Sequence, residues 1–140
     1  YVGRPREWLL PALEGELPDG SGDTKAIADF FVPFAKAATF PWKSHALWFY
    51  SQMVRWGQIQ HSAEHARIAR ETYRPDLYRA ALKPLGIALP VANAKVEGAL
   101  TAATPVGSSG ASLVLGPDGF FDGGLFDPDK LDSYLASQKL

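Results

Sequence analysis

The sequence predicts a mostly helical chain with few or no strands. Apolar residues recur at helical spacing from position 45 to position 56. Ser62, Pro75 and the pair Asp127-Pro128 stand where helices commonly begin, because their side chains suit a helix cap or a first turn. Little of the chain alternates apolar and polar residues in the way that a half-buried strand does.

The first 34 residues predict one short helix and connecting segments. Residues 5–14 read as a helix with Trp8, Leu9, Leu10 and Leu13 on one face. Residues 15–23 contain Pro and Gly and predict a turn-rich connection. Residues 26–34 are apolar and aromatic, which suits either a strand or a helix, and we favour a short helix that enters a loop.

Residues 40–57, FPWKSHALWFYSQMVRWG, are the most informative part of the chain. Ser44 is expected to cap a helix and Gly57 to close it. One side of this helix carries His45, Trp48, Phe49, Gln52, Met53 and Trp56, and the other carries Leu47, Tyr50 and Val54. Because a helix that is apolar nearly all round must be buried, we expect it to run through the middle of a larger body. Seen without that body, the piece should expose apolar side chains.

Three more helices are predicted downstream. Ser62 caps a helix that reaches about Thr72, and a second helix begins at Pro75 and ends near Gly86. Residues 86–115 have no clear period and predict a long irregular passage. A last helix spans residues 129–137 after Asp127-Pro128. We divide the chain, as a single segment, into residues 1–23, 24–88 and 89–140.

Composition excludes several functions. The 140 residues include 14 basic and 15 acidic side chains, and no basic run suggests nucleic-acid binding. The apolar runs are too short to cross a membrane. The chain has no cysteine, so it has neither disulfides nor thiol chemistry. It begins at Tyr1 rather than Met, and we expect a fragment or a processed piece of a longer protein.

Two patterns suggest metal sites. His61, Glu64 and His65 form an H-x-x-E-H string, which in inverted zinc peptidases holds zinc and activates water. Here the string stands at a helix start among polar residues, so we expect two surface histidines, with a zinc hydrolase as an alternative. The aspartates from Asp118 to Asp132 invite a calcium site, but their spacing fails the EF-hand pattern. We predict no metal and no other cofactor.

Lys43, Ser44 and His45 are the candidate ligand-binding residues. A helix start with free N–H groups attracts an oxyanion, and Lys43 adds a full positive charge. Alternatively, Ser44 only caps the helix, Lys43 is solvated and His45 packs against aromatic neighbours.

Three ordered motifs resemble the nitrate/bicarbonate solute-binding proteins of ABC transporters and the cytoplasmic nitrate sensors of the same fold. The first is Phe40-Pro41-Trp42-Lys43-Ser44 followed by Trp48-Phe49 and Arg55-Trp56-Gly57. The second is Arg74-Pro75-Asp76-Leu77-Tyr78-Arg79. The third is Phe120-Phe121-Asp122-Gly123 with Phe126-Asp127-Pro128 and Tyr134-Leu135.

The resemblance implies that the chain is the mostly α C-terminal part of a two-lobed α/β fold like that of periplasmic binding proteins. It also implies a non-catalytic protein that binds nitrate, nitrite or bicarbonate outside the cytoplasm and delivers it to a transporter permease. The alternative is a cytoplasmic nitrate sensor that binds a regulatory protein. The family's main ligand residues are expected upstream of this segment, in the remainder of the parent chain.

Overall fold

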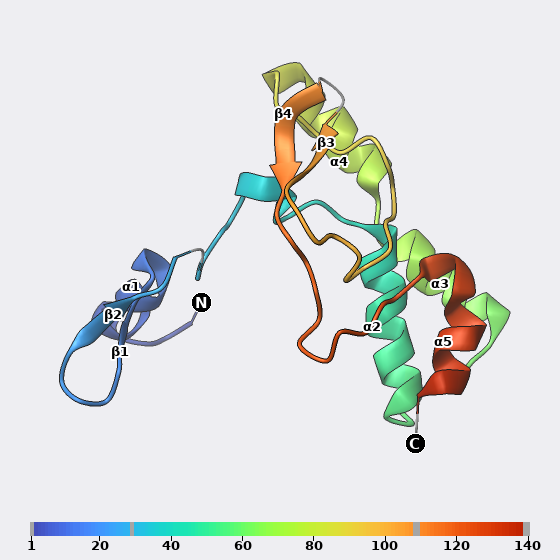
Figure 1. The fold of residues 1–140 in the computed structure, drawn as a ribbon, viewed down its shortest axis with the longest axis horizontal. Helices are drawn as coiled ribbons and strands as arrows, with labels where there is room; N and C mark the ends of the chain where they lie inside the picture. The colour runs from blue at the N-terminus through green and yellow to red at the C-terminus, as the bar shows by residue number, and fades with distance from the viewer. Residues whose placement is uncertain (1, 29, 108–109, 139–140) are drawn as a thin grey trace. The chain divides into compact units, whose positions relative to one another are not determined.

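The computed structural model describes residues 2–28, 30–107 and 110–138, which form two units, Tyr1–Ala38 and Thr39–Leu140 (Figure 1). The boundary between the units follows Ala38. Our division into residues 1–23, 24–88 and 89–140 stays a prediction. In the described part of the chain, the helices are all too short or too polar to cross a bilayer.

The first unit holds helix α1, Arg6–Glu14, and a hairpin of strands β1, Glu16–Pro18, and β2, Thr24–Ala26. The helix agrees with prediction, and it ends at Gly15, whose φ of 76° suits glycine. The predicted connection over residues 15–23 instead contains β1. The predicted helix over residues 26–34 is wrong, because Ile27 donates its N–H to Gly15 O at 2.8 Å and so extends the hairpin. A 3₁₀ turn, η1 (Ala35–Ala37), follows.

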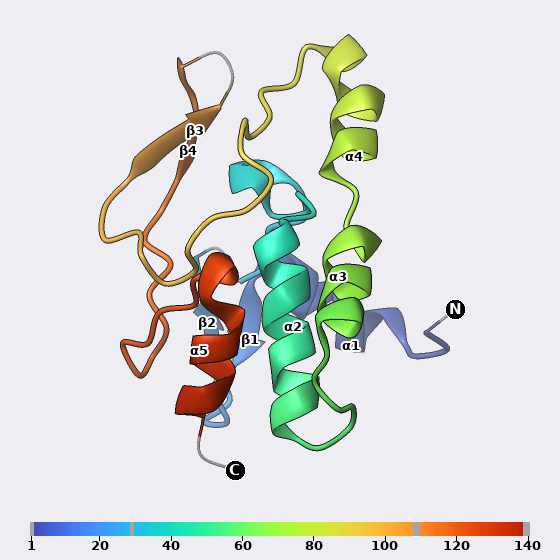
Figure 2. The same cartoon turned by 90° about the vertical axis from the view of Figure 1, so that its right-hand side faces the viewer.

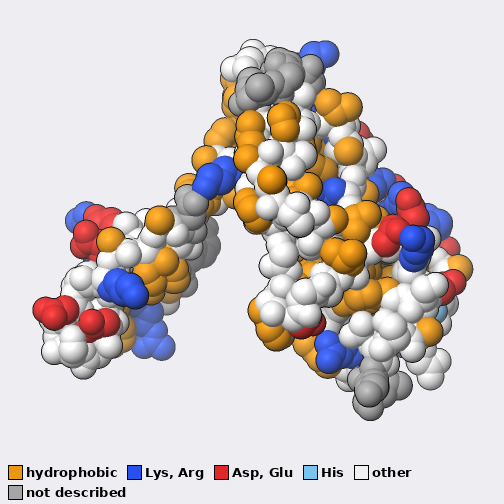
Figure 3. Space-filling model, in the orientation of Figure 1, with side chains coloured by type: hydrophobic (Ala, Val, Ile, Leu, Met, Phe, Trp, Pro, Cys, Tyr) orange, Lys and Arg blue, Asp and Glu red, His pale blue; other side chains and the backbone are white. Residues whose placement is uncertain are grey.

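Helix α2, Lys43–Arg55, lies at the centre of the second unit, between α3 (Ala63–Thr72) and α5 (Leu131–Ser137) (Figure 2). Its buried residues include Ala46, Leu47 and Tyr50. This central position is confirmed, but the helix is not buried all round. Phe49, Met53 and Trp56, spaced at i, i+4 and i+7, are 53%, 43% and 67% exposed. The exposure of apolar side chains was expected for a piece of a larger body, and Figure 3 shows hydrophobic side chains on the visible face of this unit.

The structure differs from the prediction at the N-terminal end of α2 and agrees with it at the C-terminal end. The N-cap residue is Trp42, whose O accepts the N–H of His45 at 3.0 Å. Ser44 therefore lies inside the first turn, and its hydroxyl donates to a distant carboxylate instead of capping the helix. At the other end Gly57, with φ 68°, follows the C-cap residue, and Gln58 donates to Met53 O at 2.9 Å in a Schellman motif.

The other three predicted helices are confirmed. The hydroxyl of Ser62 caps α3 by accepting from His65 N at 3.0 Å. Helix α4, Pro75–Leu82, continues as the 3₁₀ turn η2, Lys83–Leu85, and ends at Gly86. The turn η3, Pro128–Lys130, leads into α5. The Asp127 carboxylate caps η3 by accepting from Asp129 N at 3.0 Å.

The passage between α4 and η3 contains a hairpin that the sequence did not indicate. Strands β3, Thr104–Gly107, and β4, Gly110–Leu115, pair antiparallel with Thr104 opposite Leu115. Pro and Gly in β3 disfavour a strand, which explains why the pattern was missed. The start of this passage is held by Arg79, whose guanidinium donates to the carbonyl oxygens of residues 90–92 at 2.7–2.8 Å.

The core of the second unit is aromatic and aliphatic. Its buried members are Phe40, Trp42, Ala46, Leu47, Tyr50, Leu89, Leu115 and Phe126. Phe40 makes edge-to-face contacts with Trp42 at 4.8 Å and with Tyr78 at 5.5 Å between ring centroids. These contacts tie the segment before α2 to α4.

We predict that Gly98→Ala destabilises the second unit more than Gly123→Ala. Both glycines have positive φ, 83° and 70°, so both substitutions carry backbone strain. Only at Gly98 would the new Cβ lie 2.7 Å from Gly124 O, whereas nothing lies within 4 Å at Gly123. Urea denaturation should show an additional loss of about 1–3 kcal/mol for Gly98→Ala. Equal losses for the two variants would contradict the close approach.

Candidate functional site

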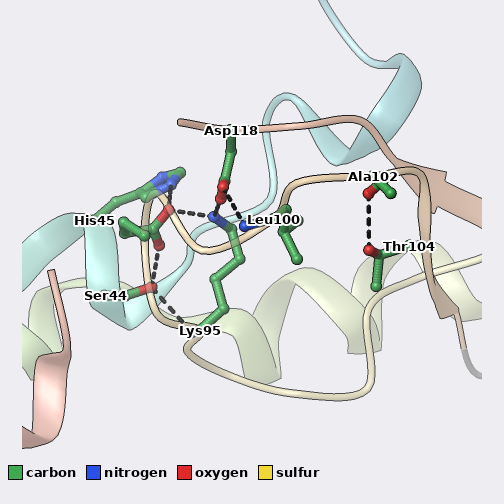
Figure 4. A network of polar contacts seen from close by, with 8 residues as sticks. Ser44, His45, Lys95, Leu100, Ala102, Thr104 and Asp118 are labelled. Carbon is green, nitrogen blue, oxygen red and sulfur yellow. Dashed lines mark hydrogen bonds and ion pairs between the residues drawn. The ribbon is translucent and has the colours of Figure 1, made fainter. Parts of the chain in front are cut away.

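Five polar side chains meet at the start of α2 and form what we call the Glu97 cluster (Figure 4): Ser44, His45, Lys95, Glu97 and Asp118. The first two come from the first turn of α2. Lys95 and Glu97 come from the passage between α4 and β3, and Asp118 follows β4. The cluster thus joins three segments that are far apart in the sequence.

The carboxylate of Glu97 is the centre of this cluster. Ser44 Oγ donates to Glu97 Oε1 at 2.5 Å, and His45 Nε2 lies 3.3 Å from Glu97 Oε2. Lys95 Nζ donates both to Glu97 Oε2 and to Asp118 Oδ2. Glu97 is only 6% exposed and Ser44 is fully buried. The carboxylate is therefore removed from water and bound on both of its oxygens.

Backbone hydrogen bonds fix the segments that carry the cluster. Lys95 N donates to Ser44 Oγ at 3.2 Å, so this hydroxyl both donates and accepts. Glu97 and Phe126 exchange a pair of backbone bonds at 2.9 and 3.0 Å. Leu100 N donates to Asp118 Oδ1 at 2.8 Å. These bonds hold the cluster in place independently of its ion pairs.

The surroundings keep Glu97 ionised despite its burial. Burial alone raises the pKa of Glu97, because it disfavours the charged form. Hydrogen bonds from His45, Lys95 and Ser44 act in the opposite direction and together outweigh burial, so the pKa of Glu97 is lowered from its ordinary value of 4.5. Two carboxylates, Glu97 and Asp118, share the single ammonium group of Lys95.

The structure places the three predicted ligand residues beside acidic groups of the chain itself. Lys43 Nζ pairs with the Glu71 carboxylate at 3.0 and 3.1 Å. Ser44 and His45 both contact Glu97. Their role as ligand-binding residues stays a prediction, but in this segment each is already engaged.

Sequence reasoning missed Lys95 and Glu97, and it considered Asp118 only as part of a calcium pattern. Lys95 and Glu97 lie in the passage over residues 86–115 that has no clear period. One signal was available: Lys95 and Glu97 are opposite charges two residues apart, which places them on one side of an extended segment.

The H-x-x-E-H string does not form a helical pair of zinc ligands. His61 precedes the cap residue Ser62, so it lies outside α3, whereas His65 lies within it. The ring of His61 contacts the Tyr50 hydroxyl at 2.9 Å through Nδ1 and Asp132 Oδ1 at 3.0 Å through Nε2. These contacts turn His61 toward α2 and α5.

Other members of both metal patterns also have partners within the protein. Glu64 pairs with Arg67, and His65 Nδ1 lies 3.0 Å from Gln60 O. The Asp122 carboxylate accepts from Gly124 N at 2.9 Å in a turn. Among the residues that the structure describes, no group of three or more His, Cys, Asp or Glu converges in a way that could hold a metal.

Comparison with known proteins gives relatives over nearly the whole chain. The nitrate/nitrite binding protein NrtA of Synechococcus elongatus is 30% identical over 140 residues, which cover 99% of this chain and 28% of NrtA. The bicarbonate-binding protein CmpA of the same organism is 30% identical over 150 residues, which cover 100% of this chain and 29% of CmpA. The resemblance to nitrate/bicarbonate-binding proteins is confirmed.

The chain spans less than a third of the length of these relatives. A shorter match, 31% identical over 87 residues, is to the nitrate import ATP-binding protein NrtC of a Synechocystis strain and covers 61% of this chain. Neither a family model nor a solved structure matches the chain. The mostly helical content agrees with our prediction for such a fragment, apart from the two hairpins.

We predict that Lys95→Met is strongly destabilising and that Lys130→Met is not. Removing the Lys95 ammonium leaves Glu97 and Asp118 close together without their shared partner, which should cost about 3 kcal/mol or more. The Lys130–Asp127 pair is an exposed matched control, with Lys130 74% exposed, and its loss should cost less than about 1 kcal/mol. Urea denaturation measures both losses of unfolding free energy. Similar losses for the two variants would show that the cluster adds little to stability.

We also predict that acid removes the contribution of Glu97 to stability. Because the pKa of Glu97 is lowered by folding, its contribution is fully present above about pH 4.5 and is lost as the pH falls through the folded value. The difference in unfolding free energy between the wild type and Glu97→Gln should therefore be constant well above pH 4.5 and shrink as the pH falls below the ordinary glutamate value of 4.5. A difference that stays constant over this range would mean that Glu97 is not a charged, stabilised carboxylate.

Proposed function

We propose that residues 1–140 are the C-terminal part of a solute-binding protein that captures a small oxyanion outside the cytoplasm for an ABC transporter. The observation that carries the proposal is the similarity to NrtA and CmpA over 99% and 100% of the chain. Nitrate, nitrite and bicarbonate, the anions in the names of these relatives, are the candidate ligands. The protein acts by binding, without catalysis.

The role of this segment is to support the two lobes of its parent protein. A groove of about 420 Å³ between α2 and α3 is lined mainly by apolar side chains, among them Phe49, Met53, Ile59 and Ile68. Phe49, Met53 and Ile68 are 43–53% exposed within the segment. Since exposed apolar surface of this kind marks an interaction site, we assign the groove to contact with the rest of the parent chain.

The anion itself is held mainly by residues outside this segment. Each candidate at the start of α2 faces an acidic side chain: Lys43 faces Glu71, and Ser44 and His45 face Glu97. An incoming anion would meet these negative charges, which disfavours its binding there. The match to the ATP-binding protein NrtC also supports a structural role, because a related segment occurs in a protein whose name gives a different function.

Calorimetric titration tests the proposal. The intact parent protein should bind at least one of nitrate, nitrite and bicarbonate, and residues 1–140 alone should release no binding heat with any of them. Chloride is the control anion, and metal analysis of the same preparation tests the zinc hydrolase alternative, with His61→Ala as its control. A parent protein that binds none of the three anions would refute the proposal.

A further inference from the structure

We propose that the Glu97 cluster is an oxyanion-binding site that the protein fills with its own carboxylate, and that a small carboxylate binds there when the Glu97 side chain is shortened. The ligand class is a planar anion with two oxygen atoms on one carbon, of which acetate and formate are the simplest members. The inference rests on the cluster alone and does not depend on the proposed transport function.

The donors of the cluster match such an anion. Glu97 presents two oxygens on one planar carbon, and different groups bind each: Ser44 Oγ binds Oε1, while the Lys95 ammonium binds Oε2. His45 Nε2 stands 3.3 Å from Oε2 as a third group. One neutral donor and one charged donor on separate oxygens fix the orientation of a carboxylate as well as its position.

Most of this arrangement is held by contacts that do not involve the Glu97 side chain. The Ser44 hydroxyl is fixed by Lys95 N, and the Lys95 ammonium is also bound by Asp118. Asp118 in turn accepts from Leu100 N. The backbone of Glu97 stays paired with Phe126 whatever its side chain is. Removing the carboxylate therefore leaves a polar cavity whose donors keep their places.

Loss of the Glu97 carboxylate also removes a negative charge that opposes an incoming anion. In the wild type the cluster holds two carboxylates and one ammonium. Without the Glu97 carboxylate, Lys95 and Asp118 balance each other, and Ser44 has lost the acceptor for its buried proton. A buried donor without a partner is unfavourable, so an anion that accepts from Ser44 restores the original set of bonds.

In the wild-type protein this arrangement makes Ser44 and His45 positioning residues for Glu97. Their donors are saturated by a carboxylate that cannot diffuse away, since it is part of the chain. A dissolved anion would have to displace a group whose effective concentration at the site is far higher than its own. The cluster therefore joins segments of the fold, although its chemistry is that of an anion site.

Rescue by acetate tests the inference in the full-length protein. The atoms deleted in Glu97→Ala are those of acetate less one hydrogen, so acetate is the best-matched probe. The variant should melt below the wild type, and about 100 mM acetate should raise its Tm by roughly 2–4 °C more than chloride at equal ionic strength. Adding Ser44→Ala to Glu97→Ala should abolish the acetate-specific rise.

Two controls decide the outcome. The wild type and Glu97→Gln, in which the position is filled, should show no difference between acetate and chloride. Equal shifts in the two salts for Glu97→Ala, or the same acetate effect in Glu97→Gln, would overturn the inference. If Glu97→Ala is recovered only as unfolded protein, refolding in acetate against chloride replaces the Tm: recovery in acetate alone supports the site, and failure in both salts contradicts it.

Failure of this test is distinguishable from failure of the proposed function. Wild-type titration with nitrate, nitrite and bicarbonate tests transport-type binding and does not involve the Glu97 cavity. A parent protein that binds nitrate while Glu97→Ala ignores acetate would retain the proposed function and lose only this inference. If instead acetate stabilises Glu97→Ala and the parent protein binds none of the three anions, the filled anion site is supported and the proposed function is refuted.

Discussion

The burial of one ionised carboxylate, that of Glu97, sets the arrangement of the second unit. A buried charge is tolerated only when partners replace the water that it has lost. Here the partners come from separate segments: Ser44 and His45 from α2, and Lys95 from the passage that follows α4. Because these partners must converge, the start of the central helix and an otherwise irregular passage are held together.

The same requirement explains how so much irregular backbone is ordered. Among the residues that the structure describes between Gly86 and Asp127, regular structure is limited to one short hairpin. Side chains and isolated backbone bridges supply the bonds that helices and sheets supply elsewhere. Arg79 binds the carbonyl oxygens of residues 90–92, and Glu97 pairs with Phe126. Each bond gives a backbone polar group a partner that a helix or a sheet would supply elsewhere.

The central helix combines two environments. One side packs in the core of the unit and presents Leu47 and Tyr50, whereas Phe49 and Met53 remain half exposed beside α3. A stable monomer seldom exposes a contiguous set of large apolar side chains without a function. Together with the fraction of NrtA and CmpA that the chain covers, this favours a segment whose fold is completed by its parent protein.

The sequence by itself determined the features that depend on near neighbours. Ser62, Asp127 and Gly57 mark helix ends because caps act within a few residues, and the ordered motifs gave the relationship to nitrate/bicarbonate-binding proteins. Only the tertiary structure decided that Ser44 would serve Glu97, 53 residues away, rather than cap its own helix. The tertiary structure also decided where the two hairpins form and which side of α2 remains exposed. The physical reason is that a carboxylate or a strand obtains its partner from whatever the folded chain brings beside it, and no local period records that choice.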